Sequence, residues 1–132
     1  MCIFCKIING DIPSYKIYED EYTYVFLDIA KDVDGHTLVV PKKHVTNILD
    51  CDNETLSHVM DTVKLVSNYY VNECGYDGVN IINANDASAQ QTVFHLHFHI
   101  IPRKNNDGID AFPHFPGANK PLEEMHELLK VK

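Results

Sequence analysis

The sequence predicts a single α+β domain with a five-stranded antiparallel sheet, one long helix and short helices. Short segments rich in β-branched and aromatic residues recur along the chain, and turn residues separate them. One amphipathic segment at helical spacing interrupts these strands, and no internal repeat or linker divides the chain. Because 132 residues can enclose a core without disulfides, residues 1–132 are expected to form one domain.

Five segments have the composition of strands. They are residues 15–19, 22–27, 36–40, 79–82 and 93–101. Asp20 and Glu21 separate the first two segments and predict a hairpin. Pro41 ends the third segment and Pro102 closes the fifth, since proline cannot donate to a strand ladder.

One long helix is predicted between the third and fourth strands. Asp52 can cap a helix that begins near Asn53, and Gly75 is a natural stop. Apolar residues recur through it at helical spacing: Leu56, Val59, Met60, Val63, Val66 and Tyr70. A second apolar set leaves room for a partner as well as a core: Leu65, Tyr69 and Val71. Pro121 suits the first position of a short terminal helix over residues 122–131.

The fifth predicted strand carries an alternating row of histidines, His95, His97 and His99. Since a strand has a side-chain period of two, the three imidazoles are expected on one face and the intervening apolar residues on the other. A neutral imidazole can attack phosphorus while its neighbours orient it or donate to phosphate oxygens. Two of the rings could instead bind zinc with a ligand from elsewhere. A solvated polar face is the third and least favoured interpretation.

Several motifs in the same order resemble one known family. The segment Gln91-Thr-Val-Phe-His-Leu-His-Phe-His-Ile-Ile-Pro resembles the histidine-triad motif, with a Gln four residues before the first His. Further similar segments are Ile3-Phe-Cys-Lys-Ile-Ile, Phe26-Leu-Asp-Ile and His36-Thr-Leu-Val-Val-Pro-Lys-Lys-His. The chain thus resembles the histidine triad (HIT) superfamily, on its Hint-like nucleotide hydrolase branch. This resemblance implies a HIT-like fold, a homodimer and attack on the α-phosphate of purine nucleoside phosphoramidates or related nucleotide conjugates.

The resemblance also implies roles for individual residues. His97, the middle ring, would be the nucleophile that forms a nucleotidyl-histidine intermediate. His99 and Gln91 would contact the α-phosphate and the leaving group. His36 would support the triad, although a lone histidine is more often a hydrogen-bonded core or edge residue. His95 completes the predicted catalytic set.

For the nucleotide, the resemblance implies that Asp28 binds both ribose hydroxyls. An apolar base slot would be lined by Phe4, Ile7, Phe26, Ile29 and Leu38, although each of these alone suits a plain core. The sequence departs from the family at Gln90, where the family has glycine. The family asparagine that precedes this loop falls between Asn83 and Asn85, and Asn83 fits the end of its strand better.

Cys2 and Cys5 form a Cys-x-x-Cys pair, which by itself is a redox pair, part of a zinc site or chance. With His44 and His95 they complete a Cys₂His₂ set. Some HIT relatives with this pair bind zinc with the first triad histidine as a ligand. A structural zinc is therefore expected, with no open position for water. No organic cofactor is expected.

The bulk composition limits the partners. A net charge of −8 argues against DNA or RNA, because repulsion opposes a polyanion. No apolar run approaches the roughly 20 residues that span a membrane, and no signal-peptide pattern occurs. Four cysteines without a secretion signal indicate a reducing compartment, so a cytoplasmic location is expected. Two alternatives to the phosphoramidase hypothesis stay open: a zinc-dependent hydrolase, and a non-catalytic nucleotide-binding or interaction domain.

Overall fold

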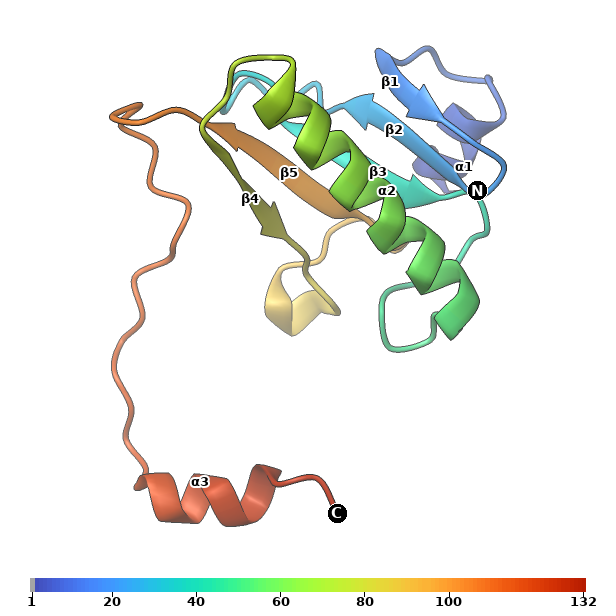
Figure 1. Ribbon diagram of the computed structural model, residues 1–132. Coiled ribbons are helices and arrows are strands. Elements are labelled where there is room, and N and C mark those ends of the chain that lie inside the picture. Colours follow the sequence, from blue (N-terminus) through green and yellow to red (C-terminus); the bar gives the residue numbers. More distant parts are fainter. Residues whose placement is uncertain (1) are drawn as a thin grey trace.

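The computed structural model describes residues 2–132, which fold around one five-stranded antiparallel sheet (Figure 1). The strands lie in the order β1-β2-β3-β5-β4. Their bounds are β1 Lys16–Glu19, β2 Thr23–Leu27, β3 Thr37–Pro41, β4 Gly78–Ile82 and β5 Phe98–Arg103. Since β5 pairs with both β3 and β4, the strand that follows the first two histidines lies inside the sheet. The predicted α+β class and five-stranded sheet are confirmed.

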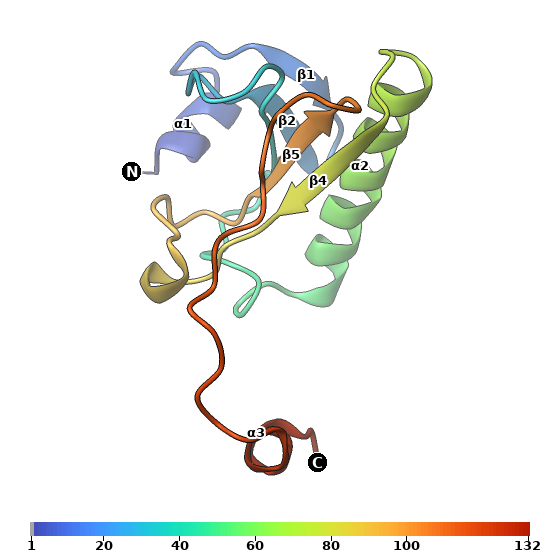
Figure 2. The same ribbon diagram turned by 90° about the vertical axis from the view of Figure 1, so that its left-hand side faces the viewer.

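Two helices lie on opposite sides of the sheet. The long helix α2, Asn53–Asn72, packs on one face, whereas the short helix α1, Ile3–Ile8, lies on the other (Figure 2). The Asp52 carboxylate accepts from the Thr55 N–H at 3.0 Å, which confirms the predicted cap. Gly75, just beyond the end of α2, has a φ of +83°, a conformation that only glycine adopts without steric cost.

The side-chain period of the strands divides the buried residues between two cores. The core beneath α2 contains Val25, Val39, Val45, Val59, Val63, Val66, Tyr70, Leu96, Phe98 and Ile100. The core beneath α1 contains Phe4, Ile7, Tyr24, Phe26, Leu38 and Val40. Because Leu96, Phe98 and Ile100 belong to the α2 core, the histidines that alternate with them face the α1 side.

Strand β5 begins later than predicted. The sequence pattern predicts a strand over residues 93–101, but β5 starts only at Phe98. Before it the chain bends, and the Leu96 N–H donates to the Val45 carbonyl, on the segment between β3 and α2, at 2.9 Å. This hydrogen bond replaces a contact with a neighbouring strand. Of the three histidines, only His99 lies within the strand.

At its other end, β5 continues through Pro102 to Arg103, although proline was expected to close it. Pairing with β3 ends at Ile100, while Pro102 still lies opposite Val79 of β4. Proline is tolerated here because β3 no longer pairs with the strand at this point.

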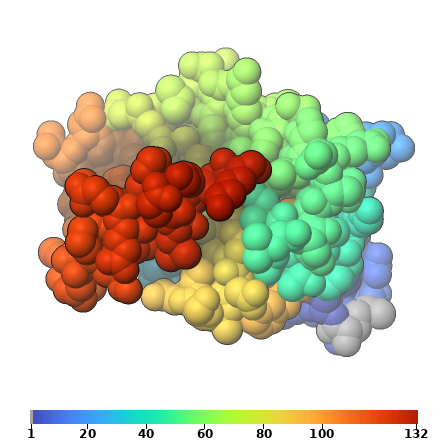
Figure 3. All heavy atoms as spheres, turned by 90° about the horizontal axis from the view of Figure 1, so that it is seen from below, coloured from blue at the N-terminus to red at the C-terminus, as the bar shows by residue number. Residues whose placement is uncertain are grey.

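The C-terminal segment leaves the body of the molecule after β5. It runs in extended form to α3, Leu122–Leu129, which stands away from the sheet (Figures 1 and 2). Seen from below, this segment is the part nearest to the viewer (Figure 3). Leu122 and Leu128 are 83% and 73% exposed, so these apolar side chains of α3 are open to solvent in the isolated chain. A terminal helix is therefore confirmed, slightly shorter than predicted.

Of the helices formed by residues 2–132, none combines the length and the apolar character that a bilayer crossing requires.

Candidate active site

His97 is held as a neutral imidazole with one free ring nitrogen. Its Nδ1–H donates to the backbone carbonyl of His95 at 2.8 Å, so the lone pair resides on Nε2. Burial lowers the pKa of His97, which keeps the ring unprotonated at neutral pH. Asn83 Nδ2 donates to the His97 carbonyl at 3.0 Å and fixes the backbone on the other side. This arrangement presents Nε2 as a nucleophile.

His36 and His99 form a directly bonded pair beside His97. His36 Nδ1 donates to both carboxylate oxygens of Asp32, at 3.0 and 3.1 Å, so its Nε2 accepts from His99 Nδ1–H at 2.8 Å. Burial, followed by the neighbouring His97 and His36, lowers the pKa of His99 to about 4. Asp32 was not predicted as a site residue, because a carboxylate in a polar loop carries no periodic signal.

Asp28 lies next to this pair and faces a cavity. Its Oδ1 accepts from the Ala30 N–H at 2.9 Å, and its Oδ2 is 3.7 Å from His36 Nε2. The cavity has a volume of about 560 Å³, and Leu27, Ile29 and Val33 also line it. A carboxylate held in this way has one oxygen available to accept hydrogen bonds from a ligand.

The residues predicted to form a base slot divide into two groups. Ile29 is 85% exposed at the cavity. The others are buried in the α1 core: Phe4, Ile7, Phe26 and Leu38. Phe4 packs edge-on against His97, with ring centroids 5.1 Å apart. Phe4 therefore supports the His97 ring, and of the five residues only Ile29 lies open to a ligand.

Gln91 has no free polar atom to offer a substrate. Its Oε1 accepts from the Asp86 N–H at 2.8 Å and from Asn47 Nδ2 at 3.2 Å. Its Nε2 donates to the carbonyls of Thr46 and Val93 at 2.8 and 3.0 Å. A carboxamide has two donors and two acceptor positions, so these four bonds satisfy it. In this structure Gln91 ties the loop after β4 to the segment before α2.

Gln90 occupies a backbone conformation that favours glycine. Its φ is +72° and its ψ is +24°, in the left-handed region, and it ends the short 3₁₀ helix Ala87–Ala89. This conformation explains the glycine that the resembling family has at this position, because glycine adopts it without steric cost. Asn85, the other asparagine considered for the site, accepts instead from the Ile48 N–H at 2.8 Å.

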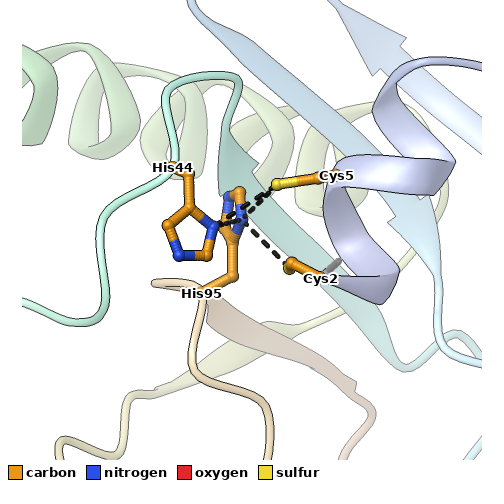
Figure 4. A group of neighbouring side chains, drawn as sticks. All are labelled: Cys2, Cys5, His44 and His95. Atoms are coloured by element: carbon orange, nitrogen blue, oxygen red, sulfur yellow. Dashed lines mark hydrogen bonds between the residues drawn. The ribbon is translucent and has the colours of Figure 1, made fainter.

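Cys2, Cys5, His44 and His95 form a compact cluster (Figure 4). The Cys2 and Cys5 Sγ atoms lie 3.5 and 3.6 Å from His95 Nδ1, and Cys5 Sγ lies 3.4 Å from His44 Nδ1. Sulfur and nitrogen ligands of a tetrahedral zinc are separated by roughly 3.5 Å. His95 Nε2–H donates to the Pro41 carbonyl at 2.8 Å, which leaves the lone pair on Nδ1. The donor set and its spacing fit zinc.

The histidine row is therefore divided between two clusters. His95 is fully buried and points to the cysteines, whereas His99 points to His36. His97 lies between them and is 8% exposed. The interpretation of the row as a solvated polar face is wrong, because His95 and His97 are buried.

Known proteins match the chain over most of its length. A family model of the HIT domain matches residues 9–106. An uncharacterised HIT-like protein of Borreliella burgdorferi is 46% identical, over 96% of this chain and 92% of its own length. An adenosine 5′-monophosphoramidase of Schizosaccharomyces pombe is 38% identical, over 99% of this chain and 97% of its own. The crystal structure of a zinc-bound histidine triad family protein of Mycobacterium smegmatis aligns with a TM-score of 0.79 at 38% identity, covering 88% of this chain and 84% of that one.

These matches place the chain in a class of α+β proteins that share the HIT fold. The chain belongs to the HIT domain family, and its relatives place it with the Hint-like members.

The burial of His99 predicts an acid-sensitive fold. Its pKa is about 4 in the folded state and about 6.5 in an unfolded chain, so the unfolded chain binds the proton first as the pH falls. The contribution to stability is complete above pH 6.5 and is lost as the pH falls toward 4. We expect the melting temperature to decrease over this interval, and to decrease less in His99→Gln. The exposed His126→Gln serves as the control, and equal pH profiles for wild type and His99→Gln would contradict the assignment.

Proposed function

We propose that this chain is a nucleotide hydrolase or transferase that attacks the α-phosphate of purine nucleoside phosphoramidates or related nucleotide conjugates. The observation that carries the proposal is the neutral His97 ring, whose Nδ1–H is held by the His95 carbonyl so that Nε2 is free. The name of the fission yeast relative, an adenosine 5′-monophosphoramidase, supports this substrate class.

In the proposed reaction, His97 Nε2 attacks the α-phosphorus. The new N–P bond forms as the bond to the leaving amine breaks, which gives a nucleotidyl-histidine intermediate. The bound phosphate raises the pKa of the nearby His99, whose protonated ring donates to the phosphate and passes its proton to the amine. Asp32, bonded to His36, stabilises the positive charge on this pair. Water then attacks phosphorus and gives a proton to the now neutral His99, the N–P bond to His97 breaks, and the nucleoside monophosphate leaves.

A structural zinc is the second part of the proposal. Cys2, Cys5, His44 and His95 would hold it with four protein ligands, so no position remains to activate water. Because His95 also supplies the carbonyl that orients His97, the metal would fix the triad segment against α1. We propose no organic cofactor.

The test is release of AMP from an adenosine phosphoramidate by the purified chain. A metal chelator in a parallel reaction separates the alternatives, because a zinc-dependent hydrolase stops at once when its metal is removed. A non-catalytic nucleotide-binding domain binds AMP but releases none from the substrate. The proposal predicts turnover that survives brief exposure to chelator.

Asp28 is predicted to accept hydrogen bonds from both ribose hydroxyls. Losing two charge-assisted hydrogen bonds costs about 1.5–3 kcal/mol, so Asp28→Asn should weaken AMP binding by roughly 10–150-fold. The 2′,3′-dideoxy form of AMP lacks both hydroxyls and should bind the variant and the wild type alike. Calorimetry with the two ligands measures the difference. Equal weakening of both would remove Asp28 from the ribose site.

A homodimer is proposed from the apolar residues that α2 leaves exposed. Leu65 and Tyr69 are 48% and 58% exposed, although both are large and apolar. Sedimentation equilibrium should give twice the chain mass of 15.1 kDa at micromolar concentration. The paired variant Leu65→Glu/Tyr69→Glu should shift the mass to that of one chain. A monomeric wild type would reject the dimer.

The cytoplasm is the proposed location. The proposed zinc site supports this location, because its ligands Cys2 and Cys5 must stay reduced, as cysteines do in a reducing compartment. The proposed partners are a nucleotide and a second copy of the chain, with no nucleic acid polymer and no membrane.

A further inference from the structure

Asp28, His36 and His99 form a second cluster of metal-ligating atoms, apart from the cysteine cluster. One ligand atom of each residue lies within 4.8 Å of the other two. His36 Nε2 is 2.8 Å from His99 Nδ1 and 3.7 Å from Asp28 Oδ2. Nitrogen ligands of a tetrahedral zinc are separated by roughly 3.3 Å. A small opening of the His36–His99 pair, with the His99 proton moved from Nδ1 to Nε2, would therefore admit a divalent ion.

Neighbouring groups already hold two of these ligands in the orientation that a metal needs. The Asp32 carboxylate accepts both bonds from His36 Nδ1–H, which leaves the His36 lone pair on Nε2. The Ala30 N–H holds Asp28 Oδ1, so Oδ2 faces His36. A carboxylate behind a ligating histidine is the usual supporting partner in transition-metal sites, since it fixes the tautomer and the ring orientation.

A cavity gives the cluster access to solvent. It has a volume of about 290 Å³, and His36, His99 and Asp32 are among the residues that line it. A tetrahedral ion with three protein ligands keeps a fourth position for water or another ligand. Imidazole and carboxylate donors suit Zn²⁺ and Co²⁺. Such an open site exchanges its metal more readily than a closed Cys₂His₂ site.

We propose that Asp28, His36 and His99 bind an exchangeable divalent transition metal that blocks the nucleotide site. The metal takes the Asp28 oxygen that faces the ribose and the His99 ring that faces the phosphate, so metal and nucleotide exclude each other. Metal binding stands on the cluster alone, whereas the competition rests on the proposed function. The metal here is an inhibitor, and the cysteine cluster is unaffected by it.

Calorimetric titration with Zn²⁺ tests the binding. We expect Asp28→Asn to bind one equivalent of Zn²⁺ fewer than wild type, or to bind that equivalent at least 10-fold more weakly. This difference does not depend on whether the cysteine cluster already contains zinc. Asp32→Asn should weaken the same equivalent roughly 10–100-fold, because it removes only the partner behind His36. Asp34→Asn, with the same charge change on the same exposed loop, should bind like wild type. His99→Gln provides an independent removal of a ligand, and melting curves check that each variant is folded.

Two results of this titration overturn the site: identical Zn²⁺ binding by wild type, Asp28→Asn and His99→Gln, or equal weakening by Asp34→Asn. The competition has its own test, in which AMP should raise the apparent Kd of this equivalent and Zn²⁺ should inhibit turnover competitively. If AMP does not bind at all, the proposed function fails while the metal site stands. Unchanged AMP affinity in the Zn²⁺-saturated protein, or faster turnover with added Zn²⁺, overturns the blocking role.

Discussion

Replacing His97 by alanine is expected to lower kcat by roughly 10³–10⁵-fold, because the variant has no nitrogen to attack phosphorus and the direct attack of water is much slower. AMP binding should change by no more than a few-fold, since Asp28 and the cavity beside it remain. Turnover of an adenosine phosphoramidate and calorimetry with AMP measure the two quantities separately.

The control for this prediction is His114→Ala, a histidine on the exposed C-terminal segment that should retain full activity. His97 is also packed against Phe4, so a melting curve should accompany the kinetics. If a folded His97→Ala keeps nearly full activity, His97 is not the nucleophile.

Removing the cysteine pair is expected to have the second largest effect. Cys2→Ser/Cys5→Ser should lose a zinc ion that the wild type holds at about one per chain. A metal present at a thousand times its Kd stabilises the fold by about 4 kcal/mol. For a domain of this size, 1 kcal/mol moves the melting temperature by about 3–5 °C, so a decrease of roughly 10–20 °C follows.

Metal analysis and melting curves of the untagged protein check this prediction. Cys51→Ser/Cys74→Ser removes two thiols outside the cluster and should keep both the zinc and the melting temperature. A wild type that contains no zinc, and that melts at the same temperature with and without chelator, would contradict the site.

The two predictions are linked through His95. Its Nδ1 faces the cysteines, and its carbonyl accepts from His97 Nδ1–H. Zinc loss is therefore expected to reduce kcat as well as stability, through the orientation of His97 rather than through any direct role in the chemistry. The link follows from the division of one row of histidines between two clusters.

The alternation of residues around the triad predicted which face each side chain occupies. Leu96 and Phe98 enter the α2 core and His97 faces α1, as a period of two requires. The same pattern did not predict the bend before β5, because a hydrogen bond from Leu96 to Val45, far away in the sequence, replaces the expected strand contact there. Local periodicity contains no information on such a bond.

The predicted site residues differ in how far the sequence could place them. Motif spacing placed Cys2 and Cys5 correctly near each other, and the fold brings His44 and His95 to them. The burial of Phe4 and the complete hydrogen bonding of the Gln91 carboxamide within the protein were not predictable, because both depend on packing between distant segments. Residue identity alone does not show whether an apolar side chain lines a slot or a core, nor whether an amide faces a substrate or the backbone.

The most direct test of the proposed function is to trap the covalent intermediate. Wild-type protein is mixed with a nucleoside phosphoramidate labelled at the α-phosphate, quenched at neutral or alkaline pH, and digested for mass spectrometry. The proposal predicts a nucleotidyl group on the peptide that contains His97, formed at least as fast as turnover, labile to acid, and absent from His97→Ala. Turnover without any such adduct in a single-turnover reaction, or an adduct on another residue, would contradict it.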